Sequence, residues 1–61
     1  MSYREAKELA FLRHQLREHL LAQNVSGAAD PLSKLRQVSS DDAELRAEYE
    51  RWAFRFELLA A

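Results

Sequence analysis

The sequence predicts an all-α protein, a helical hairpin of two long helices joined by a loop and a short connecting helix. Its single glycine and single proline, Gly27 and Pro31, lie close together and separate two long segments. Both segments are rich in Leu, Ala, Glu and Arg, which are strong helix formers. In both, apolar residues recur at spacings of three and four, as on one face of a helix. A chain of 61 residues buries only a marginal core, so we expect one helical domain over 1–61.

The first helix is expected over about 3–23. Ser2 and Glu5 have the spacing of a capping box, which places the first helical residue at Tyr3. At 100° per residue four leucines fall in one narrow stripe, which we predict to be the core seam. Phe11 falls almost opposite that stripe. The seam residues are Leu9, Leu12, Leu16 and Leu20.

The corner that follows is expected to contain a loop over 24–29 and a short helix over about 31–38. Asp30 and Pro31 are suited to the N-cap and the first helical position, because proline lacks an N–H that would have no partner there. Three apolar residues then recur every third position, which predicts about two turns with one apolar edge. These residues are Leu32, Leu35 and Val38.

The last helix is expected over about 41–59. Ser39 and Ser40 are predicted to end the short helix and cap the next one. Acidic residues in the first turn complement the positive end of a helix dipole. Such residues are present here as Asp41, Asp42 and Glu44.

This last helix has two apolar faces, which bear on the oligomeric state. One face has the alternating spacing of a coiled-coil seam: Leu45, Tyr49, Trp52, Phe56 and Leu59. The opposite face carries Ala43, Ala47, Phe54 and Leu58. Either the short helix covers the second face and completes a three-helix monomer, or a homodimer buries it. Because eight residues cover only part of a helix roughly 28 Å long, we favour a dimeric four-helix-type bundle.

Catalysis, metal binding and cofactors are not expected. The chain has no cysteine and two histidines, so the usual zinc ligands are nearly absent. His14 and Glu18 stand one turn apart, but two ligands do not make a metal site. One glycine cannot form a glycine-rich phosphate loop, and the serines fall at caps, turns or an exposed helix position. We therefore expect a protein that is not an enzyme.

The expected function is protein binding, as a small regulator, adaptor or inhibitor that uses helix–helix contacts. The formal net charge of −1 gives no strong field toward nucleic acid or an anionic membrane. Aromatic and Arg side chains outside the main seam are the expected contacts with a partner or a second copy, because such residues dominate interfaces. They are Phe11, Arg51, Phe54 and Leu58. No signal peptide or membrane span is recognisable in the sequence, so a cytoplasmic location is expected.

Nucleic-acid binding is the alternative. Residues 32–49 could form a helix-turn-helix, but the acidic start of its second helix would face phosphate. In length and hairpin form the chain also resembles the Rop-type plasmid RNA-binding proteins, which implies basic residues of paired first helices as RNA contacts. Those residues would be Arg4, Lys7, Arg13 and Arg17, although Glu5, Glu8 and Glu18 lie between them.

Overall fold

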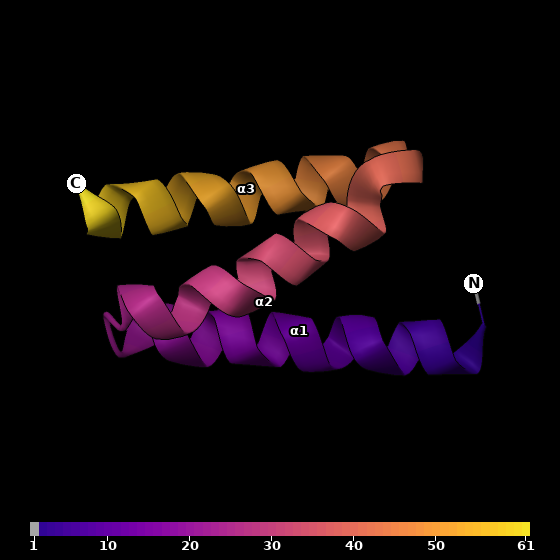
Figure 1. The fold of residues 1–61 in the computed structure, drawn as a ribbon, viewed down its shortest axis with the longest axis horizontal. Coiled ribbons are helices and arrows are strands. Elements are labelled where there is room, and N and C mark those ends of the chain that lie inside the picture. Colours follow the sequence, from indigo (N-terminus) through magenta and orange to yellow (C-terminus); the bar gives the residue numbers. More distant parts are fainter. Residues whose placement is uncertain (1) are drawn as a thin grey trace.

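The structure is a computed structural model that describes residues 2–61, and the described chain is all-helical, as predicted. It contains α1 (Tyr3–Leu21), α2 (Val25–Val38), the 3-10 turn η1 (Ser39–Asp41) and α3 (Ala43–Ala60). Figure 1 shows α1 and α3 running in the same direction, with α2 crossing obliquely between them. α2 packs on both long helices, whereas α1 and α3 touch each other least. The connecting helix is therefore the central element of the fold.

Helix α1 agrees with the prediction from sequence. The Ser2 hydroxyl accepts a hydrogen bond from the Glu5 backbone N–H at 3.2 Å, which satisfies a donor that the helix itself leaves unpaired. The helix ends two residues before the predicted terminus, because Gln23 adopts a left-handed conformation with φ of 57°. The next backbone N–H, of Asn24, returns to the His19 carbonyl at 2.8 Å. The predicted seam is buried: Leu9, Leu12, Leu16 and Leu20.

Helix α2 corrects the prediction for the corner. The loop expected over 24–29 is wrong, as is the start of the short helix at 31, because α2 already begins at Val25. Asn24 is its N-cap, and its side-chain oxygen accepts the Gly27 backbone N–H at 3.0 Å. Pro31 lies inside the helix and is buried. Its missing N–H removes one backbone hydrogen bond, and the buried stripe that includes Pro31 compensates for this loss: Ala28, Pro31, Leu32 and Leu35.

Gly27 allows the first turn of α2 to lie against the end of α1. A Cβ atom at this position would stand 2.5 Å from Nδ1 of His19 and 2.6 Å from Nδ2 of Asn24. Real Cβ atoms essentially never approach other heavy atoms so closely, so a larger residue here would have to displace the side chains of His19 and Asn24. The chain therefore reverses direction with only Ala22, Gln23 and Asn24 between the two helices.

The start of α3 also differs from the prediction. Ser39 is the C-cap of α2, and its buried hydroxyl donates to the Arg36 carbonyl at 2.9 Å. Asp42 caps α3 by accepting the backbone N–H groups of Glu44 and Leu45 at 2.9 and 3.2 Å. The expected cap at Ser39 and Ser40 is wrong, and α3 covers 43–60 rather than 41–59.

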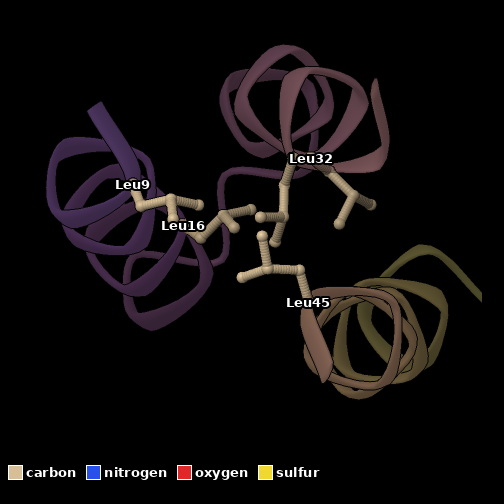
Figure 2. Close-up of a cluster of buried hydrophobic side chains, with 5 residues drawn as sticks. Leu9, Leu16, Leu32 and Leu45 are labelled. Atoms are coloured by element: carbon tan, nitrogen blue, oxygen red, sulfur yellow. The ribbon is translucent and has the colours of Figure 1, made fainter. Parts of the chain in front are cut away.

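The core forms where one stripe from each helix meets the other two. Figure 2 shows buried leucines from all three helices pointing toward one centre. Tyr49, Trp52 and Phe56 of α3 are only partly buried and pack against this centre. The predicted seam of α3 is therefore its inward face, although Leu45 is the one residue of that seam that is buried. The central cluster consists of Leu9, Leu16, Leu32, Leu35 and Leu45.

Candidate protein-binding surfaces

The second apolar stripe of α3 is open to solvent. Phe54 and Leu58 are 63% and 64% exposed, and Ala43 and Ala47 on the same stripe are also exposed. The alternative in which the connecting helix covers this stripe in a three-helix monomer is wrong, because α2 packs against the inward face of α3. We call the exposed stripe of Ala43, Ala47, Phe54 and Leu58 the Phe54 face.

The charged residues nearest to Phe54 on the two flanks of this face are of opposite sign. With 3.6 residues per turn, Phe54 lies opposite Leu45, at the middle of the exposed side. Glu50 and Glu57 lie about 40° and 60° from it on one side, whereas Arg51 lies about 60° away on the other, with Arg55 beyond it. Among residues 2–61, the ion pairs are Arg4–Glu8, Arg13–Glu48, His14–Glu18 and Lys34–Asp30. Glu50, Arg51 and Glu57 thus form no ion pair among residues 2–61.

An apolar hollow continues this surface between the last turns of α1 and α3. It has a volume of about 280 Å³. Leu21, at the end of α1, is 70% exposed here. The hollow connects the exposed Leu58 of α3 to the end of α1. It is lined by Leu20, Leu21, Arg55, Leu58 and Leu59.

Phe11 lies at a different site, on a groove between α1 and α2. Its side chain is 60% exposed and borders a cavity of about 310 Å³. Further along α1, a second hollow reaches from Phe11 to Tyr3, which is 82% exposed. The structure therefore brings Arg51, Phe54 and Leu58 together on α3. It places Phe11 apart from them, on α1 beside α2. We call this site the Phe11 groove; it is lined by Glu8, Phe11, Leu12, Gln15, Lys34, Gln37 and Val38.

A polar network links α1 to α3 beside the Phe54 face. Arg13 donates from Nε and Nη2 to the two carboxylate oxygens of Glu48, at 2.7 and 2.8 Å. Trp52 Nε1 donates to the same carboxylate at 3.2 Å, and the Arg55 guanidinium lies 5.0 Å from the Trp52 ring centroid. Hydrogen bonds from Arg13 lower the pKa of Glu48, and the bond to Glu48 raises the pKa of Arg13. This network was not anticipated from the sequence, because its two ends are 35 residues apart.

The same network bears on the basic residues of the nucleic-acid alternative. Arg13 is held by Glu48, and Arg4 lies 4.0 Å from Glu8. Each of these two cations therefore faces a carboxylate of its own chain. Of the four candidate phosphate contacts, Lys7 and Arg17 take part in no ion pair of residues 2–61.

Other candidate chemistry is sparse in the described part of the chain. His14 Nε2 lies 3.9 Å from Glu18, and both side chains are more than 60% exposed. Residues 2–61 contain no group of three or more side chains that could hold a metal ion. None of the described helices is both long enough and apolar enough to cross a membrane.

Comparisons with protein-family models, with curated proteins and with solved structures find no match to this chain. The fold and its exposed surfaces are thus the observations from which a function can be argued.

Proposed function

We propose that this chain is a small, non-enzymatic protein-binding protein, a regulator, adaptor or inhibitor that acts through helix–helix contacts and works as a homodimer. The observation that carries the proposal is the exposure of Phe54 and Leu58 on a helix whose other side already contributes to the core. Contiguous exposed apolar surface of this kind usually marks an interface. The lack of cysteine fits a reducing compartment, and we place this binding in the cytoplasm.

Burying the Phe54 face supplies a useful but limited driving force. Complete burial of a Phe or Leu side chain contributes roughly 1.5 to 3 kcal/mol. Since Phe54 and Leu58 are each about two-thirds exposed, a symmetric dimer that covers both on two chains gains on the order of 4 to 8 kcal/mol. This gain is comparable with the cost of association. We therefore expect a reversible dimer that dissociates on dilution into folded monomers.

The Phe11 groove is the surface we propose for a different protein partner. It combines an exposed aromatic side chain with neighbouring apolar and cationic groups, a composition common in interface hot spots. Because Phe11 lies on α1 and not on α3, a dimer formed through the Phe54 face leaves one groove free on each subunit. An amphipathic helix laid into such a groove is a common mode of recognition.

Nucleic-acid binding has less support. Phosphate contacts need several uncompensated cations, and carboxylates of the same chain already face Arg4 and Arg13. The acidic cap of α3, Asp42, also lies at the helix end that a helix-turn-helix would direct toward phosphate.

The proposal is tested by comparing immobilised wild-type protein with the Phe11→Ala variant in cell lysate, after nuclease treatment. Phe11 is 60% exposed, so the substitution should leave helicity and thermal stability nearly unchanged. We expect the wild type to retain a protein that the variant does not, with an affinity that depends weakly on salt. Retention of nuclease-sensitive material that is lost steeply between low and moderate salt would instead favour the nucleic-acid alternative.

A further inference from the structure

We infer that the homodimer is parallel, with two α3 helices running in the same direction around a two-fold axis and Glu50 of each subunit next to Arg55 of the partner subunit. The inference rests on the proposed self-association through the Phe54 face. It adds the orientation of the subunits and the contacts that select it.

The spacing along the Phe54 face suits a pair of closely packed helices. Ala47, Phe54 and Leu58, with Arg51 between the first two, step by four, three and four residues, which is the spacing of a left-handed coiled-coil seam. The small side chain of Ala47 allows the two backbones to approach closely. Since α3 has 18 residues, a straight pair would run alongside for about 27 Å.

The charges beside the seam decide between the two orientations. In a parallel pair, the left flank of one helix meets the right flank of the other, whereas in an antiparallel pair equal flanks meet. One flank of the Phe54 face carries Glu50 and Glu57. The other flank carries Arg55 and also Glu48, whose carboxylate is already bonded to Arg13. Parallel packing therefore brings Glu50 to Arg55 of the partner subunit, five residues further along, in the usual position of interhelical salt bridges in coiled coils.

Antiparallel packing produces the opposite result. It places Glu50 next to Glu57 of the partner subunit, where two like charges repel each other. On the other flank it directs Arg55 toward Glu48, whose carboxylate is already bonded to Arg13. In the antiparallel pair, Glu50 and Glu57 therefore lie next to no cation of the partner subunit.

Arg51 is the one charged residue of the seam that parallel packing places against its own copy. Its apolar stem covers the seam while its charged end reaches the rim, where Glu50 of the partner subunit lies beside it. Glu50 and Arg51 have no ion-pair partner within residues 2–61, so both are available for this contact. A polar residue at one seam position of a coiled coil lowers its stability and fixes its register.

The orientation is tested first by disulfide crosslinking, for which a chain without cysteine is well suited. In the parallel dimer the two Ala47 positions face each other, within the Cα separation of about 4.4 to 6.8 Å that a disulfide requires. In an antiparallel dimer position 47 faces position 58 of the partner, so the two Ala47 positions stand roughly 16 Å apart. We expect Ala47→Cys to crosslink most chains in a redox buffer. Ser33→Cys, an exposed control on α2, should crosslink only slightly.

Charge reversal gives an independent test, with the dissociation constant measured by light scattering across a dilution series. In the parallel dimer Glu50→Lys faces two guanidiniums and should weaken association roughly tenfold, whereas the matched control Glu57→Lys should change it less than about threefold. In an antiparallel dimer both variants should tighten association, because each converts a repulsive pair into an attractive one. Circular dichroism of each variant checks that the monomer fold is retained.

The outcomes separate this inference from the function on which it rests. A dimer in which Ala47→Cys fails to crosslink and Glu50→Lys tightens association would overturn the parallel orientation but leave self-association intact. A chain that remains monomeric at all concentrations would overturn both. Crosslinking of Ala47→Cys together with weakening by Glu50→Lys and no effect of Glu57→Lys would support the parallel dimer.

Discussion

The ion pair between Arg13 and Glu48 is predicted to contribute about 1 to 2 kcal/mol to the stability of the fold. Exposed ion pairs contribute about 0.2 to 1 kcal/mol, and breaking fully buried ones costs about 3 to 5 kcal/mol. The present pair lies between these limits, because the side chains of Arg13 and Glu48 are 43% and 17% exposed. The two hydrogen bonds are bidentate, with distances of 2.7 and 2.8 Å. This geometry makes the pair stronger than a typical exposed ion pair. Solvent screening at the more exposed Arg13 limits its contribution.

A double-mutant cycle measures this contribution. The free energy of unfolding in urea would be determined for the wild type, Arg13→Ala, Glu48→Gln and the double variant, all at one protein concentration because association shifts apparent stability. Each single variant should lower the melting temperature by roughly 4 to 16 °C. The coupling energy should fall near 1 to 2 kcal/mol. A coupling energy close to zero would refute the view that this pair holds α3 against α1.

The pH dependence of the same cycle has a definite sign. The pKa of Glu48 is lowered in the folded protein, chiefly by the hydrogen bond from Arg13. A carboxyl group whose pKa is lowered by folding stabilises the folded state above its ordinary value of 4.5, and this stabilisation is lost as the pH falls through the lower folded value. The stability advantage of the wild type over Glu48→Gln should therefore be constant near neutral pH and shrink below 4.5. An advantage that persisted unchanged in acid would contradict this assignment.

Three further substitutions test the fold. Leu35 is fully buried, so Leu35→Ala should cost about 2 to 5 kcal/mol and leave much of so small a domain unfolded, as measured by circular dichroism at 25 °C. Asp42→Ala removes the cap of α3 and should cost about 1 kcal/mol in urea unfolding, whereas no change would mean that the cap is dispensable. Gly27→Ala ordinarily favours a helix by about 1 kcal/mol. Here it should destabilise because the added Cβ atom meets the side chains of both His19 and Asn24, and the loss should be smaller in a His19→Ala background, where only the contact with Asn24 remains; stabilisation in the wild type would contradict these contacts.

Local signals explain which parts of the fold could be predicted from the sequence. The leucine stripe of α1 and the cap at Ser2 each depend on residues within one or two turns, so the pattern alone places them. Asn24 and Asp30 are equally good N-cap residues, and the start of α2 was wrongly predicted after the second of them. The fit of Gly27 against His19 selects the first of them. That contact lies between two helices, so the spacing of apolar residues within either helix does not reveal it.

The candidate surfaces were predictable only in part. The sequence shows that α3 has two apolar stripes, but local spacing does not tell which of them faces inward. The exposed one proves to be the stripe of Phe54 and Leu58. The Arg13–Glu48 pair was hidden for a related reason, since each residue alone is typical of a solvated helix surface. Pairs so distant in the sequence become visible only when the helices are placed beside each other.

The length of α2 explains why the Phe54 face of α3 remains exposed. The predicted helix over 31–38 would be roughly 12 Å long. The predicted six-residue loop before it would leave it free to pack over the second apolar stripe of α3. The observed helix of 14 residues is about 21 Å long and starts within three residues of α1, so its path between the long helices is fixed. Its single buried stripe then packs against the inward faces of both α1 and α3. The buried residues of α2 are Ala28, Pro31, Leu32 and Leu35, whereas Ala29 and Val38 remain exposed, so α2 leaves the Phe54 face uncovered.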